Sequence, residues 1–127
     1  HWTPRLPLPV TIIGGALLLV AWLFLMRAFT DNTFLSPLVR LQEERRQHVV
    51  STGVYAIVRH PMYLGATCMF IGGPLLVGSF AGLAIGGALS LLLAARSVGE
   101  EALLARGLAG YDDYRRKVKK RLIPFIW

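Results

Sequence analysis

The residues best suited to chemistry lie in the stretch VYAIVRHPMYLG, from Val54 to Gly65, where a polar loop meets a long apolar run. Arg59, His60 and Pro61 stand together at the start of that run, with a tyrosine on either side. Pro61 suits the first turn of a helix, because its fixed φ fits there and the first helical amides lack intrahelical partners anyway. The neighbouring free amides form a ready anion site. The same residue types also form the aromatic and basic belt at membrane interfaces, so both roles are open here.

A second polar group follows the last apolar run. Arg96 and Glu100 are four residues apart and therefore share one face of a helix. Glu101 comes next, and Tyr111 and Tyr114 precede a basic run. An i,i+4 salt bridge with a lipid-binding basic helix would explain these residues structurally. If the apolar residues between the two polar groups form a helical hairpin, however, both groups lie at the same end of it. An acid, two tyrosines, a histidine and two arginines could then line a pocket at the membrane surface.

The elements that must carry these groups are apolar helices. The chain has 127 residues, of which 54% are hydrophobic, and its mean hydropathy of +0.53 is high for a soluble domain. Residues 8–26 and 62–95 carry no charge. The second stretch as one helix would reach about 51 Å at 1.5 Å per residue, too long for a hydrocarbon core of ~30 Å. It therefore predicts two short spans, with a break at 72–74 or at 78–79. We predict an all-α membrane bundle with three transmembrane helices near 9–29, 61–77 and 80–96, followed by a cytoplasmic interfacial helix near 99–109.

Charge predicts how this bundle lies in the membrane. Of the fourteen Lys and Arg residues only Arg5 precedes the first predicted span, and the turn near 72–80 has none. By the positive-inside rule, loop 30–60 and the C-terminal segment 97–127 face the cytoplasm, and the N-terminus of this chain lies outside. The chain is thus expected to be an integral, multi-pass membrane protein. Its net charge of +7 fits a surface facing anionic lipids, and basic residues beside membrane spans argue against a nucleic-acid partner.

Other site types find no support in the sequence. Cys68 is the only cysteine and the histidines show no HExxH or comparable spacing, so we expect no metal and no disulfide framework within one chain. Gly78, Gly82, Gly86 and Ser90 recur every four residues, which predicts close helix packing rather than a binding loop. There is no GxGxxG motif, and the absence of strand–helix alternation excludes a Rossmann fold.

Together the two polar groups resemble the isoprenylcysteine carboxyl methyltransferase family of membrane methyltransferases, a wider group that includes the phospholipid methyltransferases. The stretches that carry the resemblance are TGVYAIVRHPMYLG and EEALLARGLAGYDDYRRKVKKRLIP. The resemblance extends roughly from Phe34 to Pro124. The paired signature is specific: G-x-Y-x-x-x-R-H-P-x-Y-x-G, then E-E and a late G-Y-x-x-Y. It implies one membrane domain over 1–127, S-adenosylmethionine as the cofactor on the cytoplasmic side, and a lipophilic methyl acceptor from the lipid bilayer.

The resemblance also implies roles for individual residues. Arg96 falls where the family places an arginine near the substrate carboxylate, and Arg59 is a second expected substrate contact. Arg96 and Glu100 are the expected catalytic residues. Family members carry additional N-terminal spans, so we expect such spans to be missing from this chain, with a homo-oligomer as a further expectation for its assembly. The implied cofactor contacts are Gln42, Gln47, His48, Val49, Val50, Tyr55, His60, Pro61, Met62, Tyr63, Glu100 and Glu101.

The chemistry fits that assignment. Methyl transfer from a sulfonium is an in-line displacement, which positioning and desolvation accelerate. Tyr55 or Tyr63 can face the sulfonium, Glu100 can meet the cofactor's ammonium or its ribose hydroxyls, and free helix amides with His60 can meet its carboxylate. A carboxylate acceptor needs only a counter-ion, and Arg96 offers bidentate geometry. A thiol or amine would need a proton acceptor, for which His60 and the acidic pair are the candidates.

These residues lead us to expect carboxyl O-methylation of an isoprenylcysteine-like or other lipophilic acceptor. Phospholipid N-methylation and thiol S-methylation stay open, because acceptor specificity lies in span faces made of Leu, Ile, Val and Gly. A non-catalytic membrane scaffold that keeps the fold without turnover is the alternative from another class.

Overall fold

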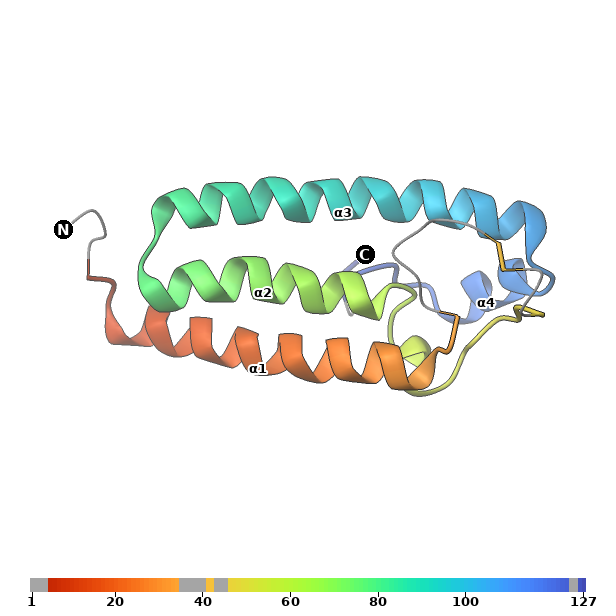
Figure 1. The fold of residues 1–127 in the computed structure, drawn as a ribbon, viewed down its shortest axis with the longest axis horizontal. Helices are drawn as coiled ribbons and strands as arrows, with labels where there is room; N and C mark the ends of the chain where they lie inside the picture. Colours follow the sequence, from red (N-terminus) through yellow and green to blue (C-terminus); the bar gives the residue numbers. More distant parts are fainter. Residues whose placement is uncertain (1–4, 35–40, 43–45, 124–125) are drawn as a thin grey trace.

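All regular secondary structure in the described part of the chain is helical. The computed structural model describes residues 5–34, 41–42, 46–123 and 126–127, and these contain four α-helices, one 3-10 helix and no strand. Helices α1, α2 and α3 lie side by side with α2 in the middle, while η2 and α4 gather at one end (Figure 1). The predicted all-α class is confirmed. In chain order the elements are α1 (Leu8–Asp31), the 3-10 helix η2 (Gly53–Ala56), α2 (Pro61–Val77), α3 (Phe80–Gly107) and α4 (Tyr111–Lys117).

Helices α1 and α2 pack closely because small residues line their contact. Gly14, Ala21 and Ala28 recur every seven residues in α1 and are all buried, since this spacing keeps them on one face of the helix. Gly65 and Gly72, also seven apart, face them from α2. A Cβ on Gly72 would lie 2.9 Å from the carbonyl oxygen of Gly14. Larger side chains at these positions would push the two helices apart.

A tight turn connects α2 to α3. Gly78 ends α2 with φ +72°, a left-handed conformation that glycine adopts without a Cβ penalty. The Ser79 side chain then caps α3 by accepting a hydrogen bond from the backbone N–H of Gly82. The predicted break at 78–79 is confirmed. The other candidate, 72–74, is wrong, because α2 continues through the proline there.

The contact between α2 and α3 also depends on small residues. A Cβ on Gly86 would collide with the backbone of Phe70, and one on Gly82 would lie 3.1 Å from the ring of Pro74. The packing role predicted for the four-residue spacing of small residues is therefore confirmed at these two positions.

Helix α3 is continuous, which corrects a sequence prediction. The predicted span 80–96 and the predicted interfacial helix 99–109 are not separate, because α3 runs unbroken through Gly99 to Gly107. Residues 94–106, which include the expected break, are mostly alanine, leucine, arginine and glutamate, which all favour a helix. A change from apolar to polar surroundings does not by itself end the hydrogen-bond ladder. The separate helix after α3 is α4, which begins only at Tyr111.

Among the described residues, two helices rather than three are long and apolar enough to cross a membrane. They are α1 and α3, whereas α2 is an apolar helix of 17 residues that falls short of a full span. Its bounds nevertheless coincide with the predicted 61–77. Large apolar side chains are exposed along all three helices, for example Leu19 at 67% and Leu91 at 74%. Apolar surface of this extent is typical of a membrane or protein contact. The predicted orientation, with the N-terminus outside, stays a prediction.

One end of the bundle carries the polar segments. Tyr55, Tyr111 and Tyr114 pack there with two valines in a cluster of buried side chains. The Asp31 carboxylate at the end of α1 accepts a hydrogen bond from the backbone N–H of Val54 at 3.1 Å, which ties η2 to α1. The start of α2 and the last turns of α3 meet at the same end (Figure 1). The expectation that the two polar groups of the sequence lie at one end of the helical hairpin is thus confirmed.

Candidate functional site

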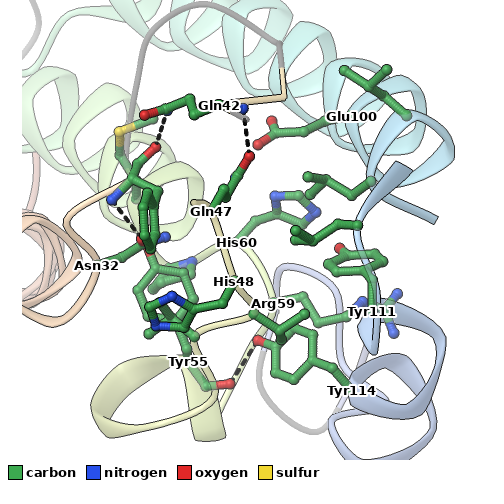
Figure 2. A pocket seen from close by; sticks show the side chains of 18 of the residues that line it. Asn32, Gln42, Gln47, His48, Tyr55, Arg59, His60, Glu100, Tyr111 and Tyr114 are labelled. Atoms are coloured by element: carbon green, nitrogen blue, oxygen red, sulfur yellow. Dashed lines mark hydrogen bonds between the residues drawn. The ribbon is translucent and has the colours of Figure 1, made fainter. Parts of the chain in front are cut away.

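A cleft opens at this end of the bundle. It encloses about 820 Å³ of empty space, part of it open to solvent. Its walls come from the segment after α1, the residues before η2, η2 itself, the start of α2, the end of α3 and α4 (Figure 2). The lining residues are Asn32, Phe34, Gln42, Gln47, His48, Val49, Val50, Tyr55, Arg59, His60, Pro61, Met62, Tyr63, Glu100, Leu103, Leu104, Leu108, Tyr111 and Tyr114.

The cleft brings together nearly all the residues that the sequence assigned to cofactor binding. Of the twelve predicted contacts, only Glu101 is not part of its lining. The expected substrate residues differ from one another, since Arg59 lines the cleft and Arg96 does not. Whether these side chains bind a cofactor stays a prediction, but their convergence from distant parts of the sequence is a property of the fold. The eleven that line the cleft are Gln42, Gln47, His48, Val49, Val50, Tyr55, His60, Pro61, Met62, Tyr63 and Glu100.

The start of α2 forms one wall. His60 is the residue before the helix and Pro61 occupies its first turn, as predicted. The first intrahelical bond runs from the Leu64 N–H to the His60 carbonyl at 3.0 Å. The amides of Met62 and Tyr63 therefore lie ahead of the intrahelical ladder, where they can bind an anion. The rings of His60 and Tyr63 stack with centroids 5.3 Å apart and an angle of 4° between their planes.

Glu100 and Tyr63 connect the two helices that flank the cleft. The Tyr63 hydroxyl donates a hydrogen bond to Glu100 Oε2 at 2.6 Å. Arg96, one turn earlier in α3, is close enough to the Tyr63 hydroxyl to interact with it electrostatically. Arg96 is itself exposed. Arg96 therefore lies near the cleft but toward the apolar part of α3, while Glu100 lies at the cleft itself.

Glu101 organises a buried ion cluster behind the cleft. Its side chain is 2% exposed. Glu101 Oε1 accepts a hydrogen bond from Arg59 Nε at 2.6 Å and lies 3.1 Å from His60 Nε2. Glu101 Oε2 accepts from Arg121 Nε at 2.9 Å. A buried carboxylate is tolerated here because two guanidiniums compensate its charge. The surroundings of Glu101 therefore give it a structural part beside the site, in place of the cofactor contact expected from sequence.

Arg59 is committed to the same cluster. Arg59 and His60 donate their backbone N–H groups to the carbonyls of Lys120 and Arg121, at 3.0 and 2.9 Å. The Arg59 guanidinium contacts Glu101 through two of its nitrogens. A guanidinium held in this way has little capacity left for a substrate carboxylate. Arg59 thus anchors the C-terminal segment to the start of α2, a role that differs from the expected substrate contact.

Burial keeps the phenols of the cleft neutral. Desolvation raises the pKa of Tyr55 to about 12. It also raises the pKa of Tyr111 and of Tyr114 well above the ordinary range. The Tyr114 hydroxyl therefore stays a donor at physiological pH, and it donates to the Tyr55 carbonyl at 2.7 Å (Figure 2). This bond fixes α4 against η2.

Part of the lining was not predicted from the sequence. Asn32 contributes through the turn after α1, where its Oδ1 accepts a hydrogen bond from the Phe34 N–H at 2.9 Å, and no sequence signal pointed to it. The leucines of α3 did carry a signal, because they follow Glu100 at helical spacing on one face. The ion pair of Arg121 with Glu101 was also not predicted, because Arg121 belongs to a basic run whose other members are mostly exposed. The lining residues without a prediction are Asn32, Phe34, Leu103, Leu104 and Leu108.

Comparison with known proteins identifies the family. Residues 9–109 match the phospholipid methyltransferase family. The match includes α1, α2 and both glutamates of α3. A comparison with curated proteins found no match. The family resemblance inferred from the paired signature is confirmed, and the chain belongs to the phospholipid methyltransferase family, which is that of the isoprenylcysteine carboxyl methyltransferase-like membrane methyltransferases.

Proposed function

We propose that this chain is an S-adenosylmethionine-dependent methyltransferase that methylates the carboxylate of an isoprenylcysteine-like or other lipophilic acceptor. The observation that carries the proposal is the single cleft lined by eleven residues that the family resemblance links to the cofactor. The cleft lies next to exposed apolar helices. A methyl donor from the aqueous side and an acceptor from the bilayer can meet at such a position.

The donor set of the cleft suits S-adenosylmethionine. The free amides of Met62 and Tyr63 favour a carboxylate. Glu100 can accept hydrogen bonds from ribose hydroxyls, and aromatic faces such as that of Tyr55 favour a cation. The leucines of α3 offer an apolar surface for a nucleobase. When bound, the cofactor supplies an electrophilic methyl group on a sulfonium.

The contribution of the chain is to position the reactants and exclude water. The Tyr63–Glu100 hydrogen bond holds α2 and α3 at a fixed separation beside the cleft, and such fixed geometry accounts for much of the acceleration of a displacement reaction. A carboxylate acceptor is ionised at pH 7 and needs no general base. Arg96 lies on the side of Glu100 that leads to the apolar part of α3, where it can pair with that carboxylate through two parallel hydrogen bonds.

In the membrane, we propose that α1 and α3 cross the bilayer with the cleft on the cytoplasmic side and α2 packed between them. The distribution of basic residues supports this orientation, since only Arg5 precedes α1 among the fourteen lysines and arginines. The N-terminus of this chain then lies outside. Labelling of single cysteines introduced at Arg5 and Arg106 tests the orientation, and labelling of both from one side would contradict it.

A second candidate reaction is N-methylation of a phospholipid amine. The description of the matched family favours it. An amine acceptor must lose a proton, and among the described lining residues Glu100 carries the only carboxylate. In this reaction the acceptor would offer no carboxylate to Arg96.

Cofactor binding is tested by isothermal titration of S-adenosylmethionine into the detergent-solubilised chain. Glu100→Gln and Tyr63→Phe should each weaken binding roughly ten- to a hundredfold, the range expected for a lost charge-assisted hydrogen bond. Asp113→Asn is the matched control, because Asp113 is exposed on α4 and its ion-pair partner among the described residues is Arg116 on the same helix. If the wild-type chain does not bind the cofactor, the enzyme proposal fails and a membrane scaffold becomes the better interpretation.

The acceptor is tested with Arg96 variants. Turnover of a farnesylcysteine analogue and of phosphatidylethanolamine vesicles is measured between pH 6 and 9. For a carboxylate acceptor, Arg96→Ala should abolish turnover with cofactor affinity almost unchanged, and Arg96→Lys should rescue poorly, since an ammonium lacks the planar fork. A fully active Arg96→Lys with a rate that rises steeply with pH would instead indicate an amine or thiol acceptor.

A further inference from the structure

Glu101 contacts one of the two ring nitrogens of His60. Glu101 Oε1 lies 3.1 Å from His60 Nε2, and both side chains are buried. An ionised carboxylate can only accept hydrogen bonds, so Nε2 must be the donor in this contact. In a neutral imidazole the other ring nitrogen, Nδ1, then carries a lone pair and is a hydrogen-bond acceptor.

Nδ1 of His60 is accessible from the cleft. It makes no hydrogen bond to any residue in the described part of the chain. If Nδ1 were fully buried, it would be a buried polar atom without a partner. In the described part of the chain, however, the only such side-chain atom is Thr67 Oγ1. Nδ1 is therefore not enclosed by the protein, and the space that His60 lines is the cleft (Figure 2).

Two arginines fix the orientation of the Glu101 carboxylate that contacts His60. Arg59 occupies Glu101 Oε1 and Arg121 occupies Oε2, so the carboxylate cannot rotate without losing both bonds. Arg121 is itself fixed, because its guanidinium lies 4.7 Å from the centre of the Trp127 ring. The orientation of His60 thus depends on residues from α3 and from the C-terminal segment together.

We propose that Glu101 is a positioning residue that keeps His60 in its Nε2-protonated form, so that Nδ1 accepts a hydrogen bond from the ligand in the cleft. The nature of that ligand rests on the function proposed above. A lone pair repels a carboxylate and attracts a donor, so the group beside His60 is the ammonium of the cofactor's amino-acid part. The cofactor carboxylate is then bound by the free amides of α2, and not by His60 as the sequence suggested.

The protonation pattern can be measured without any ligand. Nitrogen-15 NMR of the histidine side chains, recorded on the full chain in detergent micelles, distinguishes protonated from unprotonated ring nitrogens. The His60 signals are assigned by their loss in His60→Phe, which keeps a ring to stack on Tyr63. We expect one tautomer with the proton on Nε2 for His60, and an averaged mixture for exposed His48. A proton on Nδ1, or an averaged mixture like that of His48, overturns the proposal.

The ligand group is tested with S-adenosylhomocysteine and an analogue in which hydrogen replaces the amino group. In the wild type, loss of the amino group should weaken binding roughly ten- to a hundredfold. In His60→Phe the two ligands should bind about equally. If Glu100→Gln removes the discrimination and His60→Phe does not, the ammonium binds Glu100 and the proposal is overturned. If the wild type binds neither ligand, the proposed function fails, while the NMR measurement still decides whether His60 is held in the Nε2-protonated form that the Glu101 contact requires.

Discussion

The hydroxyl of Tyr114 makes the hydrogen bond that fastens α4 to η2, and Tyr114→Phe removes that bond alone. The side chain is 5% exposed, and its hydroxyl lies 2.7 Å from the Tyr55 carbonyl oxygen. The substitution leaves this buried carbonyl without its partner, which typically costs ~1–3 kcal/mol. We expect the free energy of unfolding to fall by about that amount. Because Tyr55 lines the cleft, cofactor affinity should fall as well.

The assay is equilibrium unfolding by SDS titration in mixed micelles, with cofactor titration on the same preparations. Tyr111→Phe is the matched control. Tyr111 is 4% exposed on the same helix, but its hydroxyl makes no hydrogen bond to a described residue. Its substitution should leave the free energy of unfolding nearly unchanged. Equal losses in the two variants would refute the reasoning, because they would show that the hydrogen bond contributes nothing specific.

Three further outcomes are expected. Gly86→Ala should destabilise the chain in SDS titration because a Cβ there collides with α2, whereas Gly87→Ala, which meets nothing within 4 Å, should not; equal effects would contradict this packing. Glu101→Ala should cost ~3–5 kcal/mol by leaving two guanidiniums without their carboxylate, while Glu100→Ala, which removes only the acceptor of the Tyr63 hydroxyl, should cost ~0.5–1.5 kcal/mol; equal losses in the two variants would argue against the ion cluster. Burial raises the pKa of Tyr55 to about 12 in the folded chain, against ~10 in the unfolded chain, so its contribution to the free energy of unfolding is complete below pH 10 and is lost between pH 10 and 12. Over that range the free energy of unfolding of Tyr55→Phe should fall less than that of the wild type, and an identical fall would be inconsistent with the burial of Tyr55.

The bounds of α2 were predictable because residues with one dominant preference mark both ends. Pro61 favours the first turn of a helix, and Gly78 adopts the left-handed conformation that ends it. The end of α3 was not predictable from polarity, since arginine and glutamate extend a helix as readily as leucine does. The length of α3 depends instead on where hydrogen bonding stops, at Leu108.

The different environments of the two adjacent glutamates were beyond the reach of sequence reasoning. Neighbouring residues on a helix point about 100° apart, so Glu100 and Glu101 cannot both face the cleft. Nothing local distinguishes them. The choice is made by Arg59 and Arg121, which reach Glu101 from distant parts of the chain. The cleft itself was predictable in outline, because the two polar groups flank one helical hairpin.

The unbroken α3 has a consequence for which acceptors can be methylated. A helix of 28 residues is about 42 Å long, more than the ~30 Å hydrocarbon core. In the membrane orientation proposed above, its last turns stand in the aqueous phase as an extension of the same rigid helix. Glu100 lies five residues beyond the apolar run that ends at Ala95, or about 7.5 Å along the axis. Without a hinge, that height is fixed. An acceptor whose reactive group lies deeper or higher in the headgroup layer would not reach the height of the cleft. A bilayer of different thickness would tilt α3 and so change which lipids have their reactive group at that height.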